Sequence, residues 1–204
     1  MKRFFACALL VLAAGASAGL NEGVAAYNRG DFATALTEFR PLAEQGDTSA
    51  QNRLGHMYMQ GQGVGKDPGA AIAWWRRAAG KDHATAQFNL GIAYGMGAGV
   101  TRDQAEADRW LRKSAEQGLP AAQNVLAGRY ALGLGVNADD AQAAVWWRKA
   151  AEQGHAASQV ALGNAYQSGK GVERDDKEAA FWYRLAAAQG NAAALEALKR
   201  LSRR

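Results

Sequence analysis

A glycine-rich heptapeptide, GQGVGKD at residues 61–67, is the first stretch of the chain whose composition suggests chemistry. A glycine-rich loop ahead of a helix can gather backbone N–H groups around a phosphate. The same kind of loop returns three times, each 36 residues after the previous one. The further loops are GAGVTRD at 97–103, GLGVNAD at 133–139 and GKGVERD at 169–175. A phosphate site needs one such loop, whereas a fixed interval is typical of a repeat protein, so we interpret the loops as turns.

Each 36-residue unit divides into two helical halves, which we name helix A and helix B. In the first unit Ala50, Leu54 and Tyr58 are four residues apart, which is helical spacing and not the alternation of a strand. Ala71 and Trp75 continue the same spacing in the second half. Equivalent residues recur in the other units, so we predict four helix–loop–helix repeats. The predicted repeats cover residues 47–82, 83–118, 119–154 and 155–190.

Capping residues mark where helix B begins and ends. An Asp precedes helix B in every unit, where its carboxylate can accept hydrogen bonds from the first free amides. These residues are Asp67, Asp103, Asp139 and Asp175. After helix B, Gly118, Gly154 and Gly190 stand where left-handed backbone is favoured. The first unit has Asp82 at that position, and we expect its turn to be shaped differently.

Glycine also occurs inside helix A, where it costs about 1 kcal/mol relative to alanine. It stands at Gly55, Gly91 and Gly163, and the third unit has Ala127 instead. We expect a neighbouring helix backbone to approach these glycines too closely for a β-carbon.

The two ends of the chain depart from the 36-residue pattern. Residues 22–46 carry the same helices with a shorter loop, and residues 191–204 repeat the start of helix A as a capping helix with a basic tail. Residues 1–18 run from Lys2 and Arg3 through an apolar stretch to Ala16-Ser17-Ala18, which is the order of a signal peptide cleaved after Ala18. The alternative is a buried or membrane-anchoring helix. We expect a periplasmic or secreted protein with no integral membrane segment after cleavage.

Removal of residues 1–18 would also remove the single cysteine, Cys7. The mature chain would then offer no thiol nucleophile and no disulfide, and its hydrophobic core alone would hold the fold. The 22 basic and 19 acidic residues that remain give a net charge of +3. This small excess predicts little attraction for nucleic acid.

The order of motifs in each unit resembles the Sel-one-like repeat (SLR) family, a branch of the tetratricopeptide-like (TPR-like) α/α solenoids. The last unit shows it in Leu162-Gly163-Asn164-Ala165-Tyr166, Gly169-Lys170-Gly171-Val172, Asp175 and Trp182-Tyr183. Residues 22–46 look more like an ordinary tetratricopeptide hairpin. The resemblance implies an all-α fold, a right-handed superhelical solenoid whose concave side is lined by A helices and holds a protein or peptide. Departures are Ala127 for Gly, Leu111 for an aromatic residue and Ser114 for Ala.

The tetratricopeptide register implied by the resemblance selects a candidate binding face on the A helices. Its mixture of amides around an apolar centre suits an extended peptide or a helix. The candidate residues are Asn52, His56, Gln60, Phe88, Ile92, Met96, Asn124, Leu132, Val160, Asn164 and Gln167. The alternative for Phe88, Ile92 and Met96 is that they pack between units.

Other recurring residues have structural interpretations. His83 and His155 stand two units apart, too far to share one metal ion, so we predict turn residues and neither a metal nor a cofactor. The six Trp residues are predicted to pack in the core. A recurring glutamine either bonds between units or faces the binding groove. It appears as Gln51, Gln87, Gln123 and Gln159.

Three functions follow from these patterns. The first is an exported, non-enzymatic adaptor, expected as a monomer, that binds a protein or peptide. The second is a hydrolase acting on the cell wall or β-lactams, or a penicillin-binding relative, which the missing cysteines and nucleophile disfavour. The third is peripheral attachment to the envelope through the basic residues of the tail. These are Lys199, Arg200, Arg203 and Arg204.

Overall fold

The computed structural model describes residues 18–202, in which every regular element is an α-helix. The predicted all-α repeat solenoid is therefore confirmed. The predicted signal peptide lies outside the described residues except for Ala18, and so do Arg203 and Arg204.

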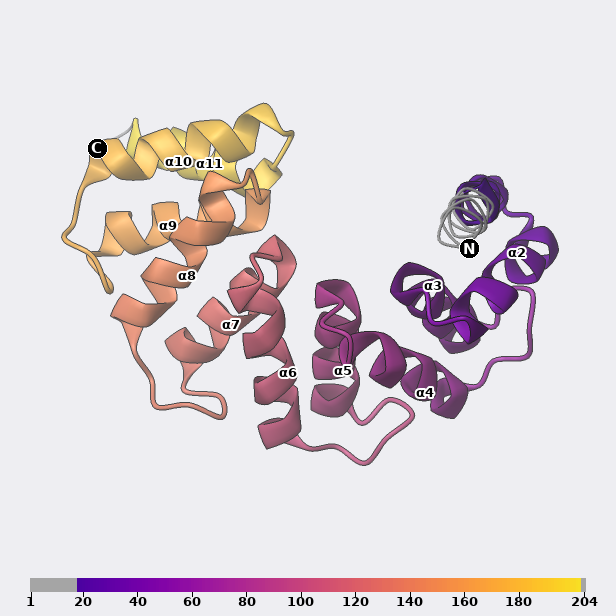
Figure 1. Cartoon of the computed structure of the whole chain (residues 1–204). Coiled ribbons are helices and arrows are strands. Elements are labelled where there is room, and N and C mark those ends of the chain that lie inside the picture. The colour runs from indigo at the N-terminus through magenta and orange to yellow at the C-terminus, as the bar shows by residue number, and fades with distance from the viewer. Residues whose placement is uncertain (1–17, 203–204) are drawn as a thin grey trace, which may run out of the picture. The chain divides into compact units, whose positions relative to one another are not determined.

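Helices follow one another along the chain as pairs joined by loops (Figure 1). Residues 18–28 are helical and precede the first labelled helix. The labelled helices are α2 (Phe32–Glu44), α3 (Thr48–Gln60), α4 (Pro68–Ala79), α5 (Ala84–Met96), α6 (Gln104–Glu116), α7 (Pro120–Leu132), α8 (Asp140–Glu152), α9 (Ala156–Ser168), α10 (Asp176–Ala188) and α11 (Ala192–Leu201). The A helices of the four predicted units are thus α3, α5, α7 and α9, and the B helices are α4, α6, α8 and α10.

The chain forms two compact units, which divide between Asp103 and Gln104. The first unit holds the helical residues 18–28 and α2 to α5. The second unit holds α6 to α11.

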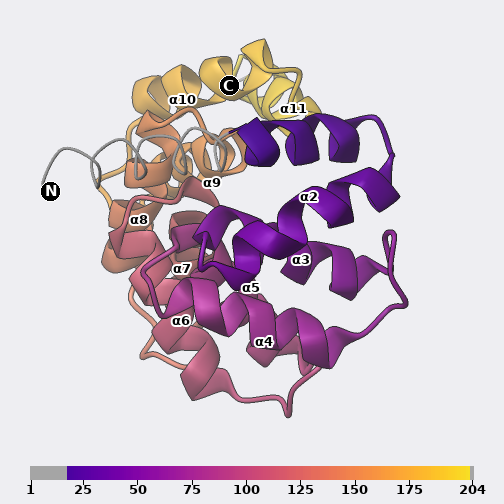
Figure 2. The same ribbon diagram turned by 45° about the vertical axis from the view of Figure 1, so that its right-hand side comes forward.

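The first unit has a core of aromatic and aliphatic side chains from its first helices. Phe39, Leu54 and Met57 are buried there, and Val24 packs against them. The helix of residues 18–28 lies next to α2 (Figure 2). Burial of such a side chain is worth about 1.5–3 kcal/mol, so these contacts hold the first helices together.

The second unit is built around buried aromatic residues of its B helices. Tyr183 is completely buried among Ala179, Ala186 and the alanines of α11, and Trp182 is buried beside Leu162. Trp75, Trp146 and Trp182 lie in the core, as predicted, whereas Trp74, Trp110 and Trp147 are half-buried.

The Asp residues before the B helices cap them. Asp67, Asp139 and Asp175 accept hydrogen bonds from backbone N–H groups three residues later, at 2.9, 2.9 and 3.1 Å. These predicted caps are confirmed, and Asp103 directly precedes α6.

The glycine-rich loops use their backbone groups to close the turn. Gly61 ends α3 in a left-handed conformation with φ 73°, and Gly63 is also left-handed. The Asp67 N–H then donates to the Tyr58 carbonyl at 2.9 Å, and the three other loops have the equivalent bond. A β-carbon on Gly63 would lie 2.6 Å from the Phe32 carbonyl oxygen, so the second glycine lets the loop pack against the preceding B helix.

Two expectations about turns and glycines are wrong. Asp82 adopts φ 58°, and the two hydrogen bonds that close its turn, from the N–H groups of Asp82 and His83, match those at the Gly118 turn. Asp tolerates left-handed backbone better than most residues, which explains why the turn keeps its shape. Inside helix A, a β-carbon on Gly55 or Gly163 would meet the ring of Trp75 or Tyr183, so a side chain and not a helix backbone fills the space.

The recurring glutamine bonds between repeats. The Gln51 side chain donates to the carbonyl oxygen of Ala43 in the preceding repeat, 2.9 Å away. Gln87, Gln123 and Gln159 make the equivalent bond to Ala79, Ala115 and Ala151. A repeated Arg–Tyr contact joins the same neighbours, as in Arg76 to Tyr94 at 2.7 Å. These bonds fix how each repeat sits on the next within a unit.

Candidate binding site

The eleven residues predicted for the binding face differ in accessibility, and Val160 of α9 is half-buried. Asn52 is buried with 8% of its surface exposed, whereas Met96 and Leu132 are 75% and 72% exposed. Gln60 and Asn164 are also exposed, and His56, Phe88, Ile92, Asn124 and Gln167 are half-buried. Six of the eleven lie in the first unit and five in the second.

In the first unit, Asn52 and His56 of α3 are brought together with Asn89 of α5. The side-chain amide of Asn89 donates to Asn52 Oδ1 at 3.0 Å and lies 3.1 Å from His56 Nε2. An amide nitrogen only donates, so His56 Nε2 is the acceptor and the proton of the neutral ring is on Nδ1. This network links the A helices of two successive repeats.

Trp75 of α4 contacts both Asn52 and His56 of this network. Its indole N–H donates to the backbone carbonyl of Asn52 at 3.2 Å, and its ring lies edge-on to His56, with 5.5 Å between ring centroids. The ring fits only because residue 55 is glycine, since a β-carbon there would lie 2.2 Å from the indole nitrogen. The helical glycine and the tryptophan of helix B therefore position the polar residues of helix A.

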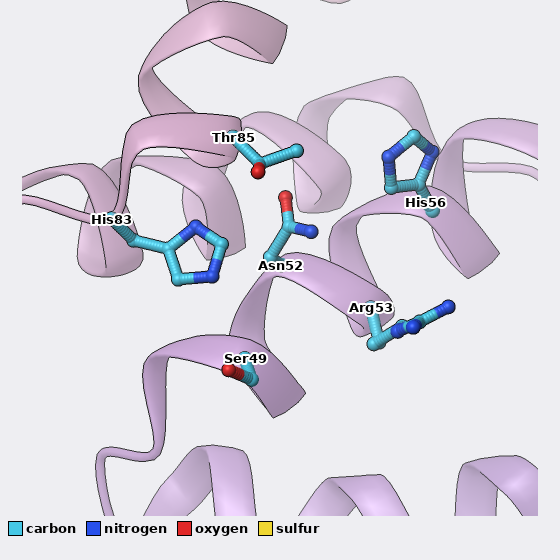
Figure 3. Close-up of a pocket in the computed structure, with 6 residues that line it drawn as sticks. All are labelled: Ser49, Asn52, Arg53, His56, His83 and Thr85. Carbon is cyan, nitrogen blue, oxygen red and sulfur yellow. The ribbon is translucent and has the colours of Figure 1, made fainter. Parts of the chain in front are cut away.

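A surface hollow of about 360 Å³ opens beside this network, between α3 and the start of α5. We call it the α3–α5 hollow, and it is lined by Ser49, Asn52, Arg53, His56, His83 and Thr85. Figure 3 shows His83 on one side, Arg53 and His56 on the other, and Asn52 and Thr85 between them.

The lining of the hollow is rich in hydrogen-bond donors and carries one permanent charge, that of Arg53. Burial lowers the pKa of His56, and the neighbouring Arg53 lowers it further. Burial also lowers the pKa of His83, although the nearby Asp47 acts in the opposite direction. Both imidazoles are therefore neutral at neutral pH.

The second unit pairs the remaining candidates differently. Ser158 of α9 donates to Asn124 Oδ1 of α7 at 2.9 Å, so this amide oxygen is occupied. The Tyr183 hydroxyl lies 2.7 Å from Asn164 Oδ1 and 3.2 Å from Gln167 Oε1, and burial raises the pKa of Tyr183. Asn124 thus links the A helices α7 and α9, whereas Asn164 and Gln167 link α9 to the B helix α10.

His83 and His155, predicted as turn residues, cap the helices that follow them. Nδ1 of each accepts a hydrogen bond from a backbone N–H three residues later, at 3.2 Å.

Ser49, Arg53, Thr85 and Asn89 were missed by the choice of candidate residues. Ser49, Asn52, Arg53 and His56 follow the i, i+3, i+4, i+7 pattern of one helix face. This spacing was the signal that could have identified Ser49 and Arg53. Thr85 and Asn89 are placed by packing of one repeat on the next.

Three further features bear on function. No helix in residues 18–202 has the length and apolar character needed to cross a bilayer. Within the same residues, no three His, Cys, Asp or Glu side chains gather as metal ligands would. At the basic tail, Lys199 is paired with Glu196 at 2.8 Å.

Comparison with family models finds four Sel1 repeats in the chain. They match residues 48–83, 84–119, 120–155 and 156–191, each beginning one residue later than the unit defined from the sequence. A search of curated proteins found no match.

Solved structures with the same fold include two that are more than 30% identical. A Sel1 repeat protein from Oxalobacter formigenes has a TM-score of 0.83 and 39% identity, over 89% of this chain and 74% of that one. The protective antigen c5321 of uropathogenic Escherichia coli, which displays an SLR fold, has a TM-score of 0.82 and 36% identity. That match covers 90% of this chain and 40% of the antigen, so this chain spans less than half of the antigen's length.

The cysteine-rich protein B of Helicobacter pylori is more distant. It has a TM-score of 0.53 and 22% identity, over 65% of this chain and 96% of that one. At this identity the likeness concerns the fold alone.

Proposed function

The chain belongs to the Sel1 repeat family, whose members are generally non-enzymatic protein-interaction scaffolds, and we propose that it binds a protein or peptide through the helix A face around the α3–α5 hollow. Repeated helix pairs supply an extended surface without supplying a chemical centre. The partner would contact α3 and α5, where the predicted residues Asn52, His56, Gln60, Phe88, Ile92 and Met96 lie.

The observation that carries this proposal is the contrast between invariant and variable positions of helix A. The leucine and tyrosine that pack in or beside the core recur in every full repeat, for example Leu54 and Tyr58. Positions that line the hollow change from repeat to repeat: Arg53 is followed by Asn89, Val125 and Ala161. Side chains that the fold does not require are free to serve recognition.

Apolar side chains of α5 can add contact area. Met96 is 75% exposed at the last position of α5, and Phe88 and Ile92 are half-buried on the same helix. A flexible thioether adapts to irregular partner surfaces, so Met96 suits an interface.

Export forms a second part of the proposal. The support is the order of charged, apolar and small residues in positions 1–18. The expected site of action is the periplasm or the medium. Intact-mass measurement of the protein recovered from cells tests this part, since a mature chain beginning at Gly19 is expected and an uncleaved chain would contradict it.

Site-specific photocrosslinking in cells tests the binding face. A photoreactive amino acid at Thr85, on the rim of the hollow, is expected to give a discrete adduct with a partner. The matched control places the same group at Ala73, an exposed position of helix B in the same unit. Adducts of equal yield at both positions, or at Ala73 alone, would contradict binding at the helix A face.

A further inference from the structure

A series of Arg–Tyr contacts along the repeats is interrupted at α10. In the earlier repeats an arginine of helix B donates to the hydroxyl of the tyrosine 18 residues later, in helix A of the next repeat. The pairs are Arg40–Tyr58, Arg76–Tyr94, Arg112–Tyr130 and Arg148–Tyr166. Arg184 of α10 stands at the next equivalent position, but residue 202 is a serine. The Ser202 hydroxyl donates to the Lys199 carbonyl oxygen at 3.0 Å and makes no contact of this kind.

Arg184 therefore lacks what its equivalents contact. It is exposed, and among the described residues it forms no ion pair. Elsewhere the guanidinium also lies over the tyrosine ring, 5.8 Å from its centre in the pair of Arg76 and Tyr94 and 5.5 Å in the pair of Arg148 and Tyr166. Arg184 is thus left without both the oxygen acceptor and the aromatic ring.

A surface hollow of about 940 Å³ lies between α10 and α11, which pack on each other (Figure 1). We call it the α10–α11 hollow. Arg184 and Ser202, the two residues of the interrupted pair, both line it. Ala180, Leu198 and Leu201 add apolar surface to the lining. The hollow is therefore open at the position where the earlier repeats hold a tyrosine.

The preceding repeat shows how a tyrosine ring fits such a position. Tyr166 of α9 packs against the cluster that contains Ala144 and Leu162, and its hydroxyl accepts a hydrogen bond from Arg148. The equivalents of these three contacts, 36 residues later, all line the α10–α11 hollow and are Ala180, Leu198 and Arg184. The hollow thus presents the side chains that hold a tyrosine one repeat earlier.

The charges of the hollow favour an aromatic ring that carries an oxygen. Lys177 also lines it and, like Arg184, forms no ion pair among the described residues. Asp176, a further lining residue, is paired with Arg174 at 3.2 Å. The unpaired charge is therefore positive, which is complementary to the negative face of an aromatic ring and to a phenol oxygen.

We infer that the α10–α11 hollow binds a tyrosine side chain of a protein partner, with the ring on Ala180 and Leu198 and the hydroxyl oxygen accepting from Arg184. A protein is the expected source of the phenol because members of the Sel1 repeat family are generally protein-interaction scaffolds. This site lies in the second unit and goes beyond the binding face proposed on α3 and α5 of the first.

NMR titration of the protein with short peptides tests the inference. The probes are acetyl-Gly-Tyr-Gly-amide, acetyl-Gly-Phe-Gly-amide and acetyl-Gly-Ala-Gly-amide. The tyrosine peptide should saturably shift the Arg184 Nε–H signal and the backbone amide signals of Ala180 and Leu198. The phenylalanine peptide should bind about fivefold more weakly because it lacks the oxygen, and the alanine peptide should give no saturable shift. Equal affinity for the tyrosine and phenylalanine peptides, or no saturable shift from the tyrosine peptide, would overturn the inference.

Ser202→Tyr tests the site from within the chain. The new ring should fill the hollow and contact Arg184 as Tyr166 contacts Arg148, so the tyrosine peptide should no longer bind. Ser202→Ala leaves the hollow open and is the matched control, which should bind the peptide like the natural chain. Binding that survives in Ser202→Tyr, or that is lost equally in both variants, would contradict the assignment.

A charge variant separates Arg184 from general attraction. Arg184→Gln should lower the affinity for the tyrosine peptide to that for the phenylalanine peptide. Lys170→Gln removes one exposed charge from a loop of the same unit and should leave the affinity unchanged. Equal effects of the two substitutions would refute the role of Arg184. These outcomes are independent of crosslinking at Thr85, which reports on the first unit.

Discussion

One position at the start of helix A shows how single residues set local stability. It is occupied in turn by Asp47, His83, Leu119, His155 and Asn191. Four of these side chains accept a hydrogen bond from the first turn of the helix, at α3, α5, α9 and α11. Leu119 makes no such bond at α7, although its backbone, with φ −64° and ψ 115°, nearly equals that of Asp47.

Leu119→Asp should therefore stabilise the protein. The new carboxylate would accept a free N–H of α7 and face the positive end of the helix, which is worth about 1 kcal/mol. Urea unfolding followed by circular dichroism measures the change. Leu119→Ala is the control, since it removes the same side chain without adding a cap, and equal stability of both variants would contradict the prediction.

The two histidine caps predict a pH dependence of stability. Neutral His83 and His155 accept backbone N–H groups, and burial lowers the pKa of both. In the unfolded chain their pKa is about 6.5, so the unfolded state takes up protons first. Their contribution to the free energy of unfolding is complete above about pH 6.5 and is lost as pH falls through the lowered folded pKa.

Replacing both histidines by asparagine should reduce this acid sensitivity. Asn191 caps α11 in the same geometry, with a hydrogen bond of 3.1 Å, so the caps are retained without a titrating group. Urea unfolding at about pH 7.5 and about pH 5.5 compares the double variant with the natural chain. A smaller loss of stability at the lower pH is expected, with His56 still titrating, and an unchanged loss would show that the caps are not responsible.

Between elements, an ion pair replaces an apolar contact at one junction. Asp108 of α6 pairs with Arg129 of α7, and both side chains are nearly buried, with 13% and 12% exposed. The same two positions hold Leu36 and Met57 at the junction of α2 and α3. The junctions share their helix packing, so the charge is not needed for the fold.

Removing one partner of this ion pair should lower the free energy of unfolding more than replacing both partners with apolar residues. Asp108→Ala leaves Arg129 buried and unpaired, which costs about 3–5 kcal/mol. Asp108→Leu combined with Arg129→Met copies the apolar junction and should be neutral or stabilising. Thermal and urea unfolding of the two variants decide the point, and a double variant less stable than Asp108→Ala would refute it.

Elements were easier to predict than the contacts between them. The period of 36 residues and the spacing of Ala50, Leu54 and Tyr58 are properties of one helix, so helix pairs and Asp caps followed from the sequence. A helix backbone was predicted next to Gly55, but the neighbour is the ring of Trp75, which is remote in sequence. The Asn52–Asn89–His56 network was missed for the same reason, since it requires the packing of one repeat on the next.

At the scale of the whole molecule, stability should be local because, within each of the two compact units, a helix packs on its neighbours in the chain. The core around Tyr183 is covered by Ala194 and Ala197 of α11. Ending the chain at Asn191 removes this cover and exposes Tyr183, so α9 and α10 should lose much of their protection from amide hydrogen exchange.

Hydrogen exchange read along the chain then separates local from global effects. Protection in α3 and α4 is expected to stay unchanged, because their core is formed by Phe39, Leu54 and neighbouring residues of the first unit. A chain ending at Leu201 retains α11 while losing the last three residues, and it distinguishes removal of the helix from removal of Arg203 and Arg204. If the shorter chain loses protection equally in α3 and in α10, the protein unfolds as one cooperative body, and nearest-neighbour packing does not describe its stability.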